Sequence, residues 1–439
     1  MHYHVWTEGC QMNVADSIRL SSVLEQIGYL PIGQPEQADV IVLNTCVVRQ
    51  SAEDKAIGRL SSLKKMKEQH PEKTICLMGC MVGVGDTTAL KKRFPYVDIF
   101  SAPSDISTLL GYLLETSKVP TEDLRSIAQS ILEKDEGFTL PLEMRGNAVS
   151  AFMPIVLGCS HACSYCVIPL RRGKEISRPP QEIIREIQSL AGQGIKEVTL
   201  LGQIVDRYGY DDPTYPTLAE LLHQIHQVEG IERIRFLTSH PNWMSDDLLD
   251  SMQALPKVMP HFELPIQAGD DEVLRRMHRG YTSEKYLAIV EKIRARFPVS
   301  SIATDLIVGF PGETATQFQH SLDLLELAKP DMTHVARYSP RPGTYSTLHM
   351  QDDVSDAEKW ERFRAVEHLQ EQITTNINAQ YLNNEVSVLF EGRKKERWYG
   401  RTPTNKLVFV ESPTPLIGKI KNVNITWTGP WSMIGEIAQ

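Results

Sequence analysis

Residues 158–166 read GCSHACSYC, and this stretch decides the fold of the middle of the chain. Its three cysteines, Cys159, Cys163 and Cys166, follow directly on MPIVL at 153–157, an apolar run typical of a buried strand. Thiolates are the natural ligands of iron–sulfur clusters, and closely spaced thiols after a strand indicate a loop that wraps one. The stretch therefore predicts a cluster at the carboxyl end of a strand.

The ligand set of this loop is incomplete, because a fully ligated four-iron cluster needs four thiolates and the loop supplies three. An iron without a thiolate is open to the amino and carboxylate groups of S-adenosylmethionine, as radical chemistry with that cofactor requires. The alternative is a zinc knuckle that His161 completes, since zinc takes Cys and His ligands. Zinc sites usually pair C-x2-C with a distant second pair of ligands, so the cluster is the favoured interpretation.

Five more strand-like runs follow the cysteine loop, with helical stretches between them. They are EVTLL at 197–201, IRFLT at 234–238, FELPI at 262–266, SIATDLIVG at 301–309 and MTHVARY at 332–338. Together with MPIVL they predict a partial (β/α)6 barrel. Functional residues of such barrels gather at the carboxyl ends of strands, although each residue there can also have a local turn or packing role. The candidates to bind cofactor or substrate are Gly202, Gln203, Ser239, His240, Gln267 and Gly309.

The first hundred residues alternate strand-like runs with amphipathic stretches, which predicts a parallel sheet of the Rossmann or flavodoxin type. The runs are HYHVW at 2–6, VIVLN at 40–44, TICLM at 74–78 and VDIF at 97–100. Cys10, Cys46 and Cys80 each follow one of these runs, and ligands of open parallel sheets collect beyond the carboxyl ends of strands. We expect these three cysteines to converge; three unrelated cysteines are the alternative. Cys76 lies within a run and is expected to be a buried apolar side chain.

The chain divides into three parts, as its 439 residues at roughly 150 residues per domain also suggest. Residues 117–149 read as a connection with one modest helix, and a capping box at Ser355 and Glu358 starts a long helix. Short β-rich runs separated by Gly and Pro then predict a small all-β barrel. The predicted domains are 1–145, 146–376 and 377–439.

The last of these parts is the basic end of an otherwise acidic chain. It holds eight Lys and Arg against five Asp and Glu, whereas the whole chain carries a net charge of −9. Its cations lie among aromatic residues, a mixture that suits RNA phosphates and bases, although a solvated basic face is the alternative. The candidate RNA contacts are Arg393, Lys394, Lys395, Arg397, Arg401 and Lys406.

Composition argues against other classes of protein. The sequence has no stretch of about 18 uncharged apolar residues, so we expect no membrane span. The start, MHYHVWTEGC, lacks the basic and apolar regions of an export signal. Seven cysteines in such a chain indicate reduced thiols and a cytoplasmic location, because stable disulfides are rare there.

Short motifs along nearly the whole chain occur in the order found in one enzyme family, and the chain resembles the methylthiotransferases. The motifs are GCQMN at 9–13, NTCVVR at 44–49, GC at 79–80, GCSHACSYCVIP at 158–169, RGKEISRP at 172–179, LLGQ at 200–203, TSHP at 238–241, IVGFPGET at 307–314 and YSPRPGT at 338–344.

The resemblance implies two [4Fe–4S] clusters. An auxiliary cluster would be held by Cys10, Cys46 and Cys80, and the second by the cysteine loop of a radical S-adenosylmethionine barrel. The C-terminal part would be a TRAM barrel that binds RNA. The resemblance further implies S-adenosylmethionine as methyl donor and radical source, an electron donor of the reductase or flavodoxin type, and a separate source of sulfur.

GCQMN and RGKEISRP are similar to the branch that acts on N6-isopentenyladenosine beside the tRNA anticodon and adds a methylthio group at carbon 2. Radical chemistry suits this carbon, because it offers acid–base catalysis neither acidity nor a leaving group. The alternatives are methylthiolation of a ribosomal-protein aspartate or of threonylcarbamoyladenosine in tRNA, and, from another class, a non-catalytic iron–sulfur or zinc RNA-binding protein. Ile204, Asp206, QAGD at 267–270 and PLRRG at 169–173 depart from the family pattern, which leaves the detailed contacts to cofactor and base open.

Overall fold

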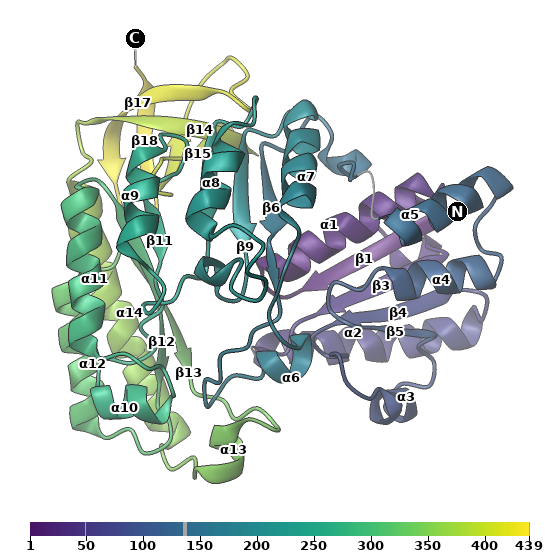
Figure 1. Cartoon of the computed structure of the whole chain (residues 1–439), viewed down its shortest axis with the longest axis horizontal. Coiled ribbons are helices and arrows are strands. Elements are labelled where there is room, and N and C mark those ends of the chain that lie inside the picture. Colours follow the sequence, from purple (N-terminus) through teal and green to yellow (C-terminus); the bar gives the residue numbers. More distant parts are fainter. Residues whose placement is uncertain (49, 135–137, 439) are drawn as a thin grey trace.

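The computed structural model describes residues 1–48, 50–134 and 138–438, and Figure 1 shows that they form three parts. An N-terminal sheet with its helices lies beside a central set of strands and helices, and a small C-terminal barrel sits on one end of the central strands. Arg49, the last residue of the NTCVVR motif, lies outside the described residues. None of the described helices has a run long and apolar enough to span a lipid bilayer.

Five parallel strands form the N-terminal sheet in the order β2-β1-β3-β4-β5. The elements are β1 His2–Glu8, α1 Gln11–Gln26, β2 Leu30–Pro31, β3 Val40–Thr45, α2 Gln50–Gln69, β4 Thr74–Gly79, α3 Thr88–Arg93, β5 Ile99–Ser101, α4 Ser107–Glu115 and α5 Glu122–Lys134. Alternate residues of β3 face opposite sides, so Val40 and Val42 pack with α1 and α4 while Ile41 and Leu43 pack with α2. Burial on both faces explains why β3 is apolar nearly throughout.

This topology confirms the predicted parallel sheet, and the four predicted strands correspond to β1, β3, β4 and β5. Strand β2 was not predicted, because a two-residue strand is too short to show a periodicity. Cys76 is buried in β4 among apolar neighbours, as expected.

Six parallel strands form the central partial barrel, as predicted. They are β6 Ser150–Pro154, β9 Glu197–Leu201, β10 Arg233–Phe236, β11 His261–Glu263, β12 Ser301–Val308 and β13 Met332–Arg337. Two sheets, β10-β9-β6 and β11-β12-β13, are joined where the Ser239 amide donates a hydrogen bond to the Glu263 carbonyl at 3.0 Å. Within the described chain the outer strands β6 and β13 do not pair, so the barrel is an open arc.

Helices surround this arc on its outer side (Figure 1). They are α7 Pro180–Gly192, α8 Leu218–His226, α9 Asp246–Ala254, α10 Asp271–Arg276, α11 Ser283–Arg296, α12 Ala315–Ala328 and α14 Asp356–Ala379, with the short α6 Ile168–Arg172 and α13 Tyr345–His349 near the loops. Helix α14 begins at the predicted capping residue Ser355, whose hydroxyl accepts a hydrogen bond from the Glu358 amide.

The first central strand begins and ends three residues before the apolar run that predicted it. The run at 153–157 is predicted as one strand, but β6 ends at Pro154 and Val156–Leu157 forms a separate strand, β7. Strand β7 pairs antiparallel with β8, Ile176–Ser177. The cysteine loop lies between these two short strands, so their pairing closes the base of the loop.

The C-terminal part is a closed barrel in the order β14-β15-β16-β18-β17, which confirms the predicted small all-β barrel. Its strands are β14 Glu385–Lys394, β15 Arg397–Arg401, β16 Leu407–Val410, β17 Ile420–Thr428 and β18 Met433–Ile437. Inward-facing apolar side chains such as Val388, Phe390, Val408, Val423 and Met433 fill its interior.

This barrel docks on the starts of the central strands, the end opposite to the cysteine loop (Figure 1). Arg233 and Arg235 of β10 donate hydrogen bonds of 2.7 and 2.8 Å to backbone carbonyls of residues 401–403. Asn378 of α14 donates at 2.8 Å to the carbonyl of Gly429. Buried polar contacts from two central elements therefore fix the barrel in place.

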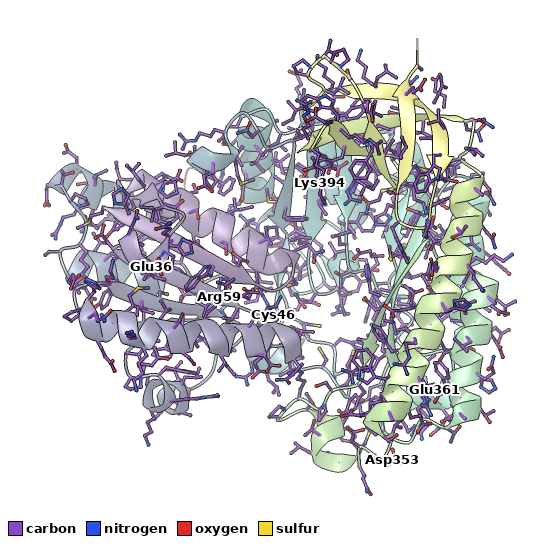
Figure 2. All side chains as sticks on the ribbon, turned by 180° about the vertical axis from the view of Figure 1, so that it is seen from behind. Glu36, Cys46, Arg59, Asp353, Glu361 and Lys394 are labelled. Carbon is purple, nitrogen blue, oxygen red and sulfur yellow. The ribbon has the colours of Figure 1, made fainter. Side chains whose placement is uncertain are left out.

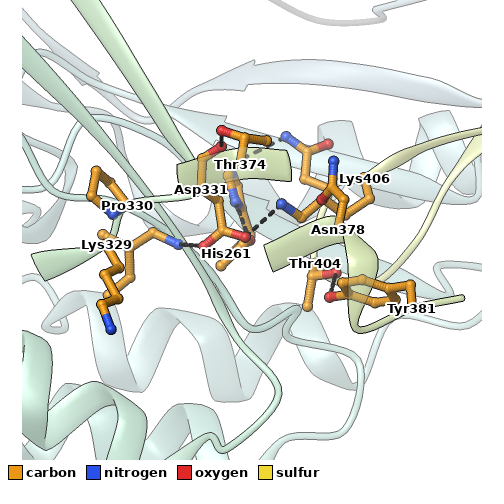
Figure 3. Close-up of polar contacts among 12 residues, drawn as sticks. His261, Lys329, Pro330, Asp331, Thr374, Asn378, Tyr381, Thr404 and Lys406 are labelled. Atoms are coloured by element: carbon orange, nitrogen blue, oxygen red, sulfur yellow. Dashed lines mark hydrogen bonds and ion pairs between the residues drawn. The ribbon is translucent and has the colours of Figure 1, made fainter. Parts of the chain in front are cut away.

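Lys406 belongs to this junction, which corrects its expected place among the RNA contacts. Its side chain is buried, the residue being 9% exposed, and its Nζ lies 2.6 Å from Oδ1 of Asp331 (Figure 3). Asp331 also accepts a hydrogen bond of 2.9 Å from the Ile302 amide. A lysine that is buried and paired in this way is not available to an RNA phosphate.

Lys406→Met should lower the free energy of unfolding by about 3 kcal/mol, because breaking a buried ion pair leaves an uncompensated charge. The double variant D331N/K406M removes both charges and keeps an acceptor for the Ile302 amide, so it should recover most of the loss. Denaturant unfolding of the two variants measures the difference. An equal loss in both would contradict this role of the pair.

Candidate active site

The carboxyl ends of the N-terminal strands and of the central strands face one cavity of about 680 Å³. Every cysteine predicted to be a ligand lines it, namely Cys10, Cys46, Cys80, Cys159, Cys163 and Cys166. Figure 2 labels Cys46 where the N-terminal part meets the central strands. The convergence follows from topology, because the loops after parallel strands emerge at the same edge of each sheet.

Close backbone packing brings Cys10 and Cys46 together. A Cβ on Gly9 would lie 2.8 Å from the Cβ of Cys46, so a side chain does not fit there. Asn13 Nδ2 donates to Asn44 Oδ1, and Asn44 Nδ2 donates to the Asn13 carbonyl, both at 2.9 Å. The asparagines of the GCQMN and NTCVVR motifs are therefore direct partners that fix the two cysteine loops against each other.

Cys80 follows β4 through Gly79, which has a φ of +98°; a Cβ there would lie 2.5 Å from the Thr45 carbonyl oxygen. The sulfur of Cys80 accepts a hydrogen bond of 3.3 Å from Nε of Arg172, whose Nη2 lies 3.6 Å from a carboxylate oxygen of Asp16. Because Arg172 is the last residue of α6, this contact joins the N-terminal sheet to the cysteine loop.

The cysteine loop is held by the segment that follows it. Gly158 has a φ of +68°, and a Cβ there would lie 2.1 Å from the Lys174 carbonyl oxygen. The Cys159 amide donates to the Gly173 carbonyl at 3.1 Å. The RGKEISRP motif therefore packs directly on the loop that it follows in the sequence.

The thiols of the site differ in acidity. Burial raises the pKa of Cys159 to about 11 and that of Cys166 to about 12. A hydrogen bond from Cys46 lowers the pKa of Cys10 to about 6, and the same bond raises the pKa of Cys46. Metal sites take thiolates, so loading the cysteine loop with iron releases protons.

The cavity also holds buried polar atoms without a hydrogen-bond partner in the described chain: Nε2 of His161, Nε2 of His240 and Oγ of Ser239. A ligand that satisfies them removes a free-energy cost. Thiols and unpartnered polar atoms on one cavity fit a cluster together with a cofactor that carries polar groups. Among the described residues, no three His, Cys, Asp or Glu side chains converge as ligands of a single metal ion, as a zinc knuckle would require.

The structure brings five of the six cofactor or substrate candidates into this cavity, namely Gly202, Gln203, Ser239, His240 and Gln267. Gly309 is not among the lining residues. Its amide donates to Oε2 of Glu313 at 2.6 Å, and a Cβ there would lie 2.3 Å from Cγ of Lys359 on α14. Gly309 therefore shapes a turn that packs against a helix.

The departures from the family pattern have local structural roles. Ile204 is buried beside Cys159. Asp206 accepts a hydrogen bond of 3.0 Å from the His240 amide, and burial raises the pKa of this carboxyl to about 7. Asp270 caps α10 by accepting hydrogen bonds from two amides of its first turn.

Two arginines at the cysteine sulfurs were not predicted. Arg279 Nη1 donates to the sulfur of Cys163 at 3.1 Å, and the two residues are 116 positions apart. Arg172 does the same at Cys80. Arg172 begins the RGKEISRP motif, which could have drawn attention to it, whereas Arg279 lies in no motif and only the fold brings it to the site.

Family models match all three parts of the chain. Residues 2–102 match Uncharacterized protein family UPF0004, residues 153–325 match the Radical SAM superfamily, and residues 379–438 match the TRAM domain. The chain is 45% identical over 440 residues to a protein of Roseiflexus sp. (strain RS-1) named tRNA-2-methylthio-N(6)-dimethylallyladenosine synthase, and the match covers 100% of this chain and 90% of that protein. The chain belongs to this synthase family.

Other members of the synthase family match over similar lengths. The protein of Herpetosiphon aurantiacus is 45% identical, with 99% of this chain and 97% of that protein covered. The protein of Dehalococcoides mccartyi (strain ATCC BAA-2266 / KCTC 15142 / 195) is 43% identical, with 100% and 98% covered.

Solved structures support the fold. The radical S-adenosylmethionine methyltransferase TsrM from Kitasatospora setae, with cobalamin and a [4Fe-4S] cluster bound, has a TM-score of 0.56 at 14% identity and covers 79% of this chain and 77% of its own. The cobalamin-dependent S-adenosylmethionine radical enzyme OxsB has a TM-score of 0.52 at 14% identity and covers 84% of this chain and 56% of its own.

Gly158→Ala should reduce the iron bound by the cysteine loop and lower the melting temperature, because its Cβ meets the Lys174 carbonyl. The matched control is Gly146→Ala: Gly146 also has a positive φ, +75°, but a Cβ there would meet no atom within 4 Å beyond its chain neighbours. Both variants carry the strain of a left-handed backbone, roughly 1–2 kcal/mol, and only the first carries the clash. Iron per chain after anaerobic reconstitution, and thermal unfolding, compare them. Equal losses in both variants would argue against the packing role of Gly158.

Proposed function

We propose that this chain adds a methylthio group to carbon 2 of N6-isopentenyladenosine next to the anticodon of tRNA, giving 2-methylthio-N6-isopentenyladenosine. The observation that carries the proposal is the single cavity lined by six cysteines from two sheets. The relatives support the choice of substrate, because each is named tRNA-2-methylthio-N(6)-dimethylallyladenosine synthase and matches this chain over at least 90% of its own length. Their names do not favour a ribosomal-protein aspartate or threonylcarbamoyladenosine.

The six cysteines divide into two ligand sets in this proposal. One [4Fe–4S] cluster belongs to Cys10, Cys46 and Cys80, and the other, with S-adenosylmethionine, belongs to Cys159, Cys163 and Cys166. When bound, these groups carry the sulfur and supply the methyl group and the one-electron chemistry that side chains lack. Gly202, Gln203, Ser239, His240 and Gln267 are the candidates to hold the cofactor and the base.

The chain itself limits access of water to the cavity. Met12 and Ala15 of α1 pack against Leu201 and Leu237 at the ends of β9 and β10. This apolar seam closes the join between the N-terminal and central sheets on one side of the cysteines. Keeping water out protects reactive species from side reactions.

The C-terminal barrel is the proposed tRNA contact. Arg393, Lys394, Lys395 and Arg397 are exposed on the β14–β15 hairpin, and Figure 2 labels Lys394 on this barrel. The target base must leave its stack at a cost of roughly a few kcal/mol, which such backbone contacts offset. Arg401, half-buried with Nη1 donating to the Asn405 carbonyl, stays a candidate contact.

The boundaries 1–145, 146–376 and 377–439 are consistent with the three ranges that family models match. The family resemblance supports a cytoplasmic location, an electron donor of the reductase or flavodoxin type and a separate sulfur source.

Nucleoside mass spectrometry tests the reaction. Anaerobic incubation of the reconstituted protein with isopentenylated tRNA, S-adenosylmethionine and reductant should yield 2-methylthio-N6-isopentenyladenosine. tRNA that lacks the isopentenyl group should stay unmodified. If the tRNA gained no methylthio group while a ribosomal protein was methylthiolated, the proposed substrate would be refuted.

Cys163→Ala provides the control for the division of ligands. It should abolish cleavage of S-adenosylmethionine while about four irons stay bound at the N-terminal cysteines. Iron analysis and detection of 5′-deoxyadenosine measure the two effects separately. Loss of all iron would show that the ligands are divided in another way.

Lys394→Gln with Lys395→Gln should weaken tRNA binding and lower the salt dependence of the binding constant, with a change of about 1 in slope for each lost phosphate contact. The matched control is K64Q/K65Q, which removes two exposed lysines from α2. Affinities measured at several salt concentrations compare the two variants. If both variants change the slope alike, the hairpin is not a specific RNA contact.

A further inference from the structure

Two buried arginines each donate a hydrogen bond to a cysteine sulfur, one in each ligand set. Arg172 Nε lies 3.3 Å from the sulfur of Cys80, and Arg279 Nη1 lies 3.1 Å from the sulfur of Cys163. Arg172 is 8% exposed and Arg279 is 5% exposed. A guanidinium stays protonated in proteins, so each set of thiolates has a permanent cation beside it.

The two arginines differ in what balances their charge. Arg172 lies 3.6 Å from the carboxylate of Asp16, and both side chains are buried. Asp16 is held in place by the Ser104 hydroxyl, which donates to it at 2.7 Å. Burial raises the pKa of Asp16 and the neighbouring Arg172 guanidinium opposes that shift; with Asp16 ionised, the two side chains form a nearly neutral unit next to Cys80.

Apart from the sulfur of Cys163, the hydrogen-bond partners of Arg279 are neutral groups. Its Nε donates to the Tyr281 hydroxyl at 2.9 Å, and its Nη2 donates to the Pro265 carbonyl at 3.4 Å. Within the described chain it forms no ion pair with a carboxylate. A full positive charge therefore stands beside Cys163.

Hydrogen bonds to cysteine sulfurs and nearby charges set the reduction potential of an iron–sulfur cluster. Reduction adds one electron, so a cation beside the cluster favours the reduced form. Burial strengthens the effect because water and salt screen such a charge less than an exposed one. The effect should be larger where the cation has no counter-charge.

We propose that Arg279 raises the reduction potential of the cluster at Cys159, Cys163 and Cys166, and that Asp16 cancels most of the same effect of Arg172 at the other cluster. The two arginines are tuning residues that act through a cysteine sulfur, and Asp16 acts through Arg172. The proposal rests on the two clusters of the proposed function. Each cluster takes one electron from an external reductant, and no bond forms or breaks in this step.

The difference in charge balance beside the two clusters suits the proposed reaction. The cluster that must accept an electron to cleave S-adenosylmethionine is the one beside the unbalanced cation. The auxiliary cluster, which carries sulfur, lies beside a neutral pair. An incoming electron is thus directed to the cluster where it is used.

Redox titration of full-length protein followed by electron paramagnetic resonance tests the effect of Arg279. The radical cluster is isolated in a C10A/C46A/C80A background. R279Q should shift the oxidised-to-reduced ratio about tenfold toward the oxidised form at a given potential, which is about 59 mV for a one-electron couple. R279K keeps the charge and should recover at least half of this shift.

Arg275→Gln is the matched control, because Arg275 is one turn away on α10 with a side chain 72% exposed. Its charge is screened by solvent, so the ratio should change less than about twofold. An unmoved midpoint in R279Q, or equal shifts in R279Q and R279K, would overturn the proposal. Failure of R279Q to hold its iron would also overturn it, since the arginine would then be a structural anchor.

The auxiliary cluster is measured in a C159A/C163A/C166A background. D16N removes the counter-charge of Arg172, so the oxidised-to-reduced ratio of the auxiliary cluster at a given potential should shift about tenfold toward the reduced form. R172Q/D16N removes both charges and should return this ratio to near the parent value. A D16N midpoint that stays constant or falls would contradict the compensation by Asp16.

A failure of the proposed function can be distinguished from a failure of the proposed tuning of the clusters. It would appear in the parent protein, before any change at these residues, as an absence of iron or of methylthiolated nucleoside. Clusters with shifted potentials but no product would support the tuning roles and refute the function.

Discussion

The structure depends on one steric constraint: within the N-terminal sheet, and within the segment that carries the cysteine loop, backbone must approach backbone closely enough for the cysteines to face one cavity. Gly9, Gly79 and Gly158 make this approach possible, since a Cβ at any of them would lie within 3 Å of a neighbouring atom. The paired amides of Asn13 and Asn44 then fix the first two loops. Parallel topology places the carboxyl ends of the strands at one edge of each sheet. The close glycine contacts and the Asn13–Asn44 hydrogen bonds then hold the cysteine-bearing loops at that edge.

The two ends of the central barrel have different tasks. The carboxyl end carries thiols, unpartnered polar atoms and two cations. The amino end carries the buried arginines and the ion pair that hold the C-terminal barrel. Fold stability and chemistry are thus separated along the strand direction, which lets the junction be rigid while the cavity keeps polar groups available for ligands.

Much of the fold and the ligand set could be predicted from sequence, because the relevant signals are local. An apolar run followed by a cysteine marks a strand end, and four such strand ends, which carry six cysteines in all, indicated the site. Arg279 escaped prediction because it approaches Cys163 from a distant segment, and the role of Asp16 needs the same three-dimensional information. Lys406 was misplaced because charge composition cannot distinguish an exposed lysine from one that is paired with Asp331. Gly309 was assigned to the cavity from its strand-end position, while its neighbours Glu313 and Lys359 show a packing role.

The C-terminal barrel is attached chiefly through its main chain. Arg233, Arg235 and Asn378 reach carbonyl oxygens of residues 401–403 and 429, and these acceptors are present whatever side chains stand there. Substitutions on this barrel that spare Lys406 and its ion pair with Asp331 can therefore accumulate during evolution while these main-chain contacts are kept. The β14–β15 hairpin, the proposed tRNA contact, is free to adapt to different tRNA sequences while its distance from the cysteine-lined cavity is preserved.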